Sequence, residues 1–192
     1  MYGEVFNFVK PHLFKSNLEL EFRLGKKNSN YFDTNIGKEN YEKVHRRLMR
    51  YKEWDSVKHQ KAVVYYGVRK GLRIVYDEDT DVQNVITKYN FATNDNILTE
   101  QPFDVRISLA IENPATYDQE KDRFPVVKKR VRTSFIRKGL SIDMSIVEND
   151  DKDSENQFIY QLEFEILDPS SLDDVSFANH YQKIFDVLKL FV

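Results

Sequence analysis

The feature that most constrains this chain is a two-residue alternation of apolar and charged side chains, which recurs along most of its length. The stretch LELEFRLG, residues 18–25, shows it clearly. Read as a strand, it places Glu19, Glu21 and Arg23 on one face and only apolar side chains on the other. The apolar face requires a core. The charged face is either solvated or holds a cation between its two glutamates.

The same alternation predicts about eight strands. A hairpin is expected over residues 61–79, turning near the RKG of residues 69–71, because glycine is typical of tight turns. The other expected strands are residues 18–25, 84–91, 103–112, 126–135, 140–148 and 158–167. Apolar residues spaced three and four apart predict amphipathic helices at residues 37–54 and 176–191. Polar, turn-rich connections are expected at residues 113–125 and 149–157.

The charges on these strands are segregated by sign. Acidic residues dominate segments 18–25 and 158–167, whereas basic residues dominate segment 126–135. Any one charged face could simply be solvated, as in many antiparallel sheets. A sheet of eight strands tends to close on itself, however, and apolar faces turned inward would leave the two helices little to cover. We therefore expect a mainly β (α+β) fold: an eight-stranded antiparallel closed barrel with a charged lumen, flanked by a few helices.

Composition excludes several classes of protein. The chain of 192 residues, 41% hydrophobic, suits one domain over residues 1–192. With no cysteine it has no disulfide, no cysteine zinc site and no cysteine nucleophile, which fits a reducing compartment. The net charge of −2 means that any anion site must come from local clustering. The chain has neither a P-loop motif nor an apolar run of membrane-spanning length, so we expect no membrane partner.

The four histidines are scattered over segments expected to be helices or loops. We expect surface or hydrogen-bonded core roles for His12, His45, His59 and His180.

A lumen that carries both a carboxylate cluster and a cluster of arginine and lysine needs compensation, because unpaired charges outside bulk water are costly. The two clusters could pair with each other. They could instead hold a divalent cation, which takes oxygen ligands, and a polyphosphate, which arginine binds through paired donors.

Five motifs then resemble those of a known superfamily. ELEFR (19–23 with its flanks) and QLEFEI (161–166) resemble the two glutamate strands of the triphosphate tunnel metalloenzymes. The resemblance is closest to the metal-dependent RNA 5′-triphosphatases of fungal and DNA-virus mRNA capping, including giant viruses of the mimivirus type. DVRISLAIE, KKRVRTSF and SIDMS lie between them in the order typical of that group. Arg23 stands where the cyclase and thiamine triphosphatase branch usually has lysine, which favours the capping branch.

The resemblance implies a role for each matching residue. The metal ligands, for Mg²⁺ or Mn²⁺, would be Glu19, Glu21, Glu163 and Glu165. The phosphate-binding residues would be Arg73, Lys128, Arg130 and Arg132. Glu112 would position or deprotonate the attacking water, and the tunnel-wall residues that support the site would be Arg23, Lys88, Arg106 and Asp143. Gln161 replaces an acid common in the family and is expected to have a lesser role, and Arg130 stands where lysine is common.

The implied activity is hydrolysis of the γ-phosphate of triphosphate-ended RNA, the first step of capping, with nucleoside triphosphates as further substrates. A guanylyltransferase would follow in the same polypeptide, with this domain as its N-terminal part, or act as a partner subunit. The implied location is intracellular: a viral factory, a virion or a nucleus. Three alternatives stay open: an inorganic tripolyphosphatase or nucleotide cyclase, a non-catalytic barrel, and, for Glu112 alone, a simple ion pair with Arg106.

Overall fold

The computed structural model describes residues 2–148 and 157–192, and nine strands of this part of the chain form one antiparallel sheet. The strands are β1 (Leu18–Lys27), β2 (Phe32–Asp33), β3 (Ser56–Tyr66), β4 (Leu72–Asp77), β5 (Val82–Asn96), β6 (Asp104–Pro114), β7 (Val126–Arg137), β8 (Leu140–Glu148) and β9 (Phe158–Ile166). The order across the sheet is β2-β1-β6-β5-β4-β3-β7-β8-β9.

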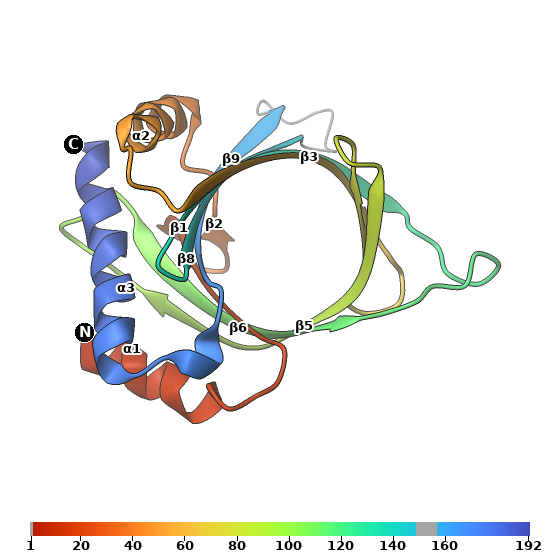
Figure 1. Cartoon of the computed structure of the whole chain (residues 1–192), viewed down its shortest axis with the longest axis horizontal. Coiled ribbons are helices and arrows are strands. Elements are labelled where there is room, and N and C mark those ends of the chain that lie inside the picture. The colour runs from red at the N-terminus through yellow and green to blue at the C-terminus, as the bar shows by residue number, and fades with distance from the viewer. Residues whose placement is uncertain (1, 149–156) are drawn as a thin grey trace.

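Strand β1 closes this sheet into a barrel because it pairs with β6 on one side and with β9 on the other. In the second pairing Glu21 lies opposite Glu165 and Arg23 lies opposite Glu163. Viewed along the barrel axis, the eight long strands surround an open ring (Figure 1). The expected eight-stranded antiparallel barrel is thus confirmed, and β2 is a two-residue addition that pairs only with the end of β1.

Three helices cover one side of the barrel: α1 (Tyr2–Val9), α2 (Lys38–Arg50) and α3 (Asp174–Leu188) (Figure 1). Short 3-10 turns lie at Lys10–His12, Pro169–Ser171 and Lys189–Phe191. Helix α3 begins with a capping box between Asp173 and Ser176, which satisfies backbone donors at its first turn. The helices bury the apolar outer faces of the adjacent strands, among them Phe22 and Phe164, each at most 1% exposed. The core of this protein therefore lies outside its barrel.

On the opposite side of the barrel, around β3, β4 and β5, no helix of residues 2–148 and 157–192 lies over the sheet (Figure 1). Its outer face is partly covered by the connection between β6 and β7. The rings of Tyr117 and Phe124 stand edge-on, 5.6 Å apart, and Phe124 is likewise edge-on to Tyr65 of β3 at 6.5 Å. Other outward side chains near this side stay in solvent, such as Val131, which is 46% exposed.

Several expected boundaries need correction. β3 begins at Ser56, five residues before the expected strand, and β5 runs on to Asn96 across a bulge between Asn90 and Ala92. The amphipathic helices are 38–50 and 174–188, and neither α1 nor β2 was expected. The polar connection at 149–157 lies, apart from Gln157, outside the described residues. In the described part of the chain, no helix is long and apolar enough to span a membrane.

Candidate active site in the tunnel

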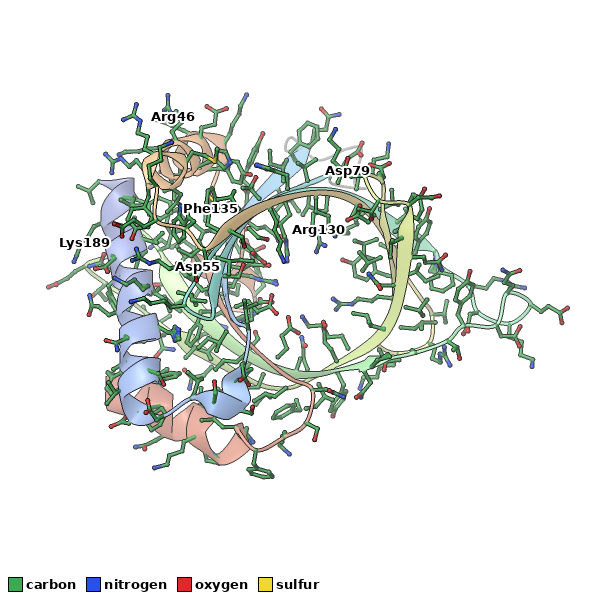
Figure 2. All side chains as sticks on the ribbon, in the orientation of Figure 1. Arg46, Asp55, Asp79, Arg130, Phe135 and Lys189 are labelled. Carbon is green, nitrogen blue, oxygen red and sulfur yellow. The ribbon has the colours of Figure 1, made fainter. Side chains whose placement is uncertain are left out.

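The lumen is a polar cavity of about 390 Å³. Because successive strand residues point to opposite faces, the residues that oppose the buried apolar ones all turn inward. Figure 2 shows this division: Arg130 points into the tunnel, whereas Phe135 of the same strand lies between the barrel wall and the helices. The charged residues that line the cavity are Glu19, Glu21, Glu112, Glu163 and Glu165, together with Arg23, Arg73, Lys88, Lys128, Arg130 and Arg132. The prediction that both glutamate strands face one cavity is confirmed.

The acidic part of the wall comes from β1 and β9. Glu21 is only 7% exposed and Glu163 only 4%. Burial and the nearby charge of Glu163 raise the pKa of Glu21 to about 7. Burial, with the charges of Asp143 and Glu19, likewise raises the pKa of Glu165 to about 7. Burial also opposes ionisation of Glu163, but Arg23 and Arg132 outweigh it and hold the pKa of that carboxyl below its ordinary value. Without a cation, burial and neighbouring acids thus disfavour the charged forms of Glu21 and Glu165, whereas Glu163 is held ionised by its two arginines.

Two cations stand among these carboxylates. Arg23 pairs with Glu21 at 2.7 Å and with Glu163 at 2.6 Å. Lys88 donates to Oε1 of Glu19 at 2.6 Å and approaches Glu21 at 3.8 Å. Both residues occupy the wall positions expected of supporting groups.

The donor set of this cluster suits a hard divalent cation. Among the described residues, no three His, Cys, Asp or Glu side chains are gathered as metal ligands, and Arg23 and Lys88 lie between the acids. Yet Glu165 lines the cavity without a hydrogen bond or ion pair to any described residue. Carboxylate oxygens with surplus charge are the ligands that Mg²⁺ and Mn²⁺ prefer.

The basic part of the wall comes from β4 and β7, and three of its four cations lack acidic partners among the described residues. Arg73, Lys128 and Arg130 form no ion pair within the described chain; the guanidinium of Arg73 lies 5.3 Å from the ring centre of Tyr66. Nε of Arg130 is buried without a hydrogen-bond partner. Burial and the charge of Arg132 lower the pKa of Arg130 to about 10. This wall holds positive charge that an anion would stabilise.

Arg132 differs from these cations because it joins the two walls. Its Nη1 donates to Asp143 at 2.8 Å, its Nη2 to Glu163 at 2.8 Å and its Nε to the hydroxyl of Ser145 at 2.9 Å. Asp143 is 3% exposed and accepts a further hydrogen bond from Ser141 at 2.5 Å. Asp143 thus lies behind Arg132 rather than in the cavity lining, as a supporting residue would.

Glu112 and Arg106 do not pair with each other, although the sequence left that alternative open. Glu112 pairs with Lys88 at 3.4 Å, and its side chain is 36% exposed. Burial and the charge of Glu19 raise its pKa. Arg106 pairs instead with Asp95, through bonds of 2.7 and 2.9 Å, and is not among the residues that line the cavity. The alternative of a Glu112–Arg106 ion pair is therefore wrong, and Arg106 supports the barrel beyond the cavity.

Some polar residues of the tunnel were not predicted as part of the site. Tyr66, Asn90 and Ser108 line the cavity, and Gln60 and Ser145 hold its arginines. Asn90, Ser108 and Ser145 share strand parity with Lys88, Glu112 and Asp143, and that signal could have found them. Strand β3, which carries Gln60 and Tyr66, has no charged residue in the cavity lining and so gives no such signal. Gln161 lines the cavity as expected.

The four histidines lie away from the tunnel lining. His45 and His59 both contact the hydroxyl of Thr133, at 3.4 and 3.2 Å. His180 contacts the carbonyl of Lys138 at 3.0 Å, and His12 stands edge-on to Phe91. Their expected place away from the tunnel is confirmed, but His59, expected in a helix or loop, lies in strand β3.

A closed antiparallel barrel whose lumen sets glutamates of two adjoining strands against arginines and lysines has the fold and site of a triphosphate tunnel enzyme. The sequence profile of the family described as "mRNA capping enzyme, beta chain" matches residues 10–192, and the chain belongs to that family. It is an RNA 5′-triphosphatase of the tunnel type.

Two solved structures illustrate the shared fold. The Pct1 RNA triphosphatase of S. pombe superimposes with a TM-score of 0.81 at 15% identity, covering 98% of this chain and 91% of Pct1. The Mimivirus capping enzyme triphosphatase gives a TM-score of 0.67 at 14% identity, covering 98% of this chain and 96% of the viral one. A search of curated proteins by sequence found no significant match.

Proposed function

We propose that this RNA 5′-triphosphatase removes the γ-phosphate by divalent-cation-assisted, in-line attack of water within the tunnel. The observation that carries the proposal is the division of one cavity between surplus carboxylates on β1 and β9 and unpaired cations on β4 and β7. A metal–triphosphate complex complements this division, since its cation would face the carboxylates and its phosphates would face the arginines and lysines. Tunnel triphosphatases are metal-dependent in general, and we assign the cation here as Mg²⁺ or Mn²⁺.

The cation would be held by Glu19, Glu21, Glu163 and Glu165. Glu165 has free oxygens, and Lys88 and Arg23 would shift their contacts as the carboxylates turn to the ion. The ion supplies neutralisation of the negative charge on the transferring phosphoryl group. Arg23 and Lys88 then fix the orientation of the carboxylates, and Asp143 and Ser145 fix Arg132.

The triphosphate would be gripped by Arg73, Lys128, Arg130 and Arg132. Preorganised cations of this kind stabilise charge as it develops on the phosphate oxygens. Arg73, Lys128 and Arg130 need not break an ion pair to bind, because none has an acidic partner in the described chain.

Glu112 would orient the attacking water and accept its proton. Its raised pKa makes it a better base than an ordinary glutamate, and its exposed position lets water reach it. Lys88, which contacts both Glu112 and Glu19, links this base to the acidic wall.

We propose further that the domain acts with a guanylyltransferase, in the same polypeptide or as a partner subunit, and that it also hydrolyses free nucleoside triphosphates. Membership of the capping family supports an intracellular site of action. The chain is rich in Asn, Lys, Tyr, Ile and Phe. This composition is typical of proteins from AT-rich genomes and supports a giant-virus source.

The test is release of phosphate from γ-labelled triphosphate RNA with and without Mg²⁺ or Mn²⁺, beside ATP and inorganic tripolyphosphate. We expect metal-dependent cleavage of the RNA end, strongly reduced in Glu21→Gln and retained in Glu78→Gln, a surface change in the β4–β5 turn. Cleavage of tripolyphosphate but not of RNA would identify an inorganic tripolyphosphatase instead. No hydrolysis of any triphosphate would favour a non-catalytic barrel.

A further inference from the structure

Arg130 is held in the tunnel wall by a neutral partner. Its Nη2 donates to Oε1 of Gln60 at 3.1 Å, which is the only hydrogen bond that this guanidinium makes within the described chain. Arg132, two residues along the same strand, is held by the carboxylates of Asp143 and Glu163 instead. Two arginines that line the same cavity are thus held by different acceptors: Arg130 by a neutral amide oxygen and Arg132 by two carboxylates.

Gln60 is itself anchored. Its Nε2 donates to Oδ2 of Asp77 at 2.8 Å. The other carboxylate oxygen of Asp77 accepts from the backbone N–H of Asp79 at 3.1 Å and of Thr80 at 2.9 Å, so the β4–β5 turn fixes its orientation. Because Asp77 accepts from the amide nitrogen, the amide of Gln60 is fixed with its oxygen toward Arg130, the orientation that an arginine donor requires.

The strand register makes this bridge possible. Ala62 of β3 lies directly opposite Arg130 on β7 and opposite Asp77 on β4. Its small side chain, 1% exposed, leaves space over β3 between the two longer ones. The amide of Gln60, one lumen-facing position away on β3, reaches into this space and joins them.

We propose that Gln60 is a positioning residue of the phosphate site, which holds the Arg130 guanidinium through a neutral amide anchored on Asp77, so that Arg130 keeps its whole positive charge for the triphosphate. The inference rests on the proposed assignment of Arg130 to phosphate binding. A glutamate at position 60 could still accept from the guanidinium, but it would lose the donor to Asp77 and would compete with the incoming anion, since an ion pair in a half-buried wall offsets much of the charge. A lysine at position 130, by contrast, has no planar fork for the amide to orient.

The test measures the dissociation constant of inorganic tripolyphosphate by calorimetry in EDTA, together with kcat and KM on triphosphate RNA in Mn²⁺. Gln60→Ala frees the guanidinium, and losing one hydrogen bond of ordinary strength should weaken tripolyphosphate binding about fivefold. Gln60→Glu should weaken it by more, roughly tenfold or beyond, because the new carboxylate neutralises Arg130. Gln83→Glu, which adds the same charge at an exposed position on β5, is the matched control and should bind as wild type.

A double-mutant cycle separates positioning from general stability. In an Arg130→Lys background, Gln60→Ala should change tripolyphosphate affinity by less than about twofold, because the fork that Gln60 orients is gone. Equal losses in both backgrounds, or wild-type affinity in Gln60→Glu, would overturn the inference. If Gln60→Ala lowers the melting temperature markedly, Gln60→Met, which keeps the length of the side chain, carries the same expectation. Failure of the wild type to bind tripolyphosphate would instead contradict the proposed function.

Discussion

The two sides of the barrel wall differ in what lies behind them. Strands β1, β6, β8 and β9 are backed by the helices and a buried aromatic and aliphatic core, whereas β3, β4 and β5 are backed mostly by solvent and one long connection (Figure 1). The backed side carries the glutamates, and the bare side with β7 carries the unpaired cations. Like charges held a few ångströms apart repel, and Arg23 and Lys88 offset part of this repulsion. The acidic cluster is therefore built on the part of the wall that the outer core supports.

The largest expected difference between the two sides is in stability. Phe164→Ala should cost about 3–5 kcal/mol of unfolding free energy, because Phe164 is fully buried under the helices and directly follows Glu163. Val131→Ala, on the outer face of β7 and 46% exposed, should cost less than about 1 kcal/mol. Urea unfolding of both variants measures this, and similar costs would mean that the helices do not stiffen the acidic wall.

The next largest difference concerns activity and its dependence on metal. Glu21→Gln keeps the shape but removes an anionic oxygen, and should lower kcat/KM by roughly 10²-fold or more, with partial recovery as Mn²⁺ is raised. Arg132→Ala should lose a similar factor but should not recover with metal, because it removes a phosphate donor. Metal titrations of the two variants, with circular dichroism as the control for folding, provide the measurement. Identical metal titrations for the two variants would contradict the assignment of metal binding to the acidic wall and phosphate binding to the basic wall.

A smaller effect distinguishes two residues within the basic wall. Arg132→Lys should lower the rate of γ-phosphate release on the order of 10-fold, because lysine cannot reproduce the donors that reach Asp143, Glu163 and Ser145. Arg130→Lys should lower it less, since only one hydrogen bond is lost. The rates at saturating Mn²⁺ provide the measurement. Full activity in both variants would mean that these arginines supply only general positive charge, which would contradict their assignment as phosphate-binding residues.

The smallest effect is a pH dependence confined to the acidic wall. The pKa of Glu165 is raised to about 7 in the folded protein, so the neutral form is favoured there. The stability contributed by this carboxyl is complete below its unfolded pKa, near 4.5, and is lost as pH rises toward 7. In EDTA, wild type should lose about 1 kcal/mol relative to Glu165→Gln across that window, after allowance for partial exposure. Added Mn²⁺ should remove the difference, and a pH-independent difference would contradict the raised pKa.

Much of the fold could be predicted because strand alternation is a local signal. The lumen faces of β1, β7 and β9 follow directly from the parity of Glu19, Arg130 and Glu163. The two-residue β2 carries too short a pattern to recognise. Helix α1, whose sequence YGEVFNFV is mostly apolar, lacks the polar face that marks an amphipathic helix.

The partners of the charged residues were harder to predict. Lys88 meets Glu19, and Gln60 meets both Arg130 and Asp77, across strands whose order and stagger are set by closure of the whole barrel. The Asn90–Ala92 bulge shifts the register of β5 against β6 and so helps to decide where Arg106 lies. Such contacts depend on the register of neighbouring strands, which parity alone leaves open.

The pairing of β1 with β9 has a consequence for how the protein is made. β1 is synthesised first among the strands of the barrel and β9 last, and the barrel closes only when these two strands pair. Closure is therefore a contact of very long sequence separation. Such contacts form slowly, because the loop entropy is lost before any pairing compensates for it. Glu21 and Glu165 meet across this same seam. A nascent chain therefore cannot assemble the carboxylate cluster before β9 has left the ribosome, and the two glutamate strands meet only when the barrel closes.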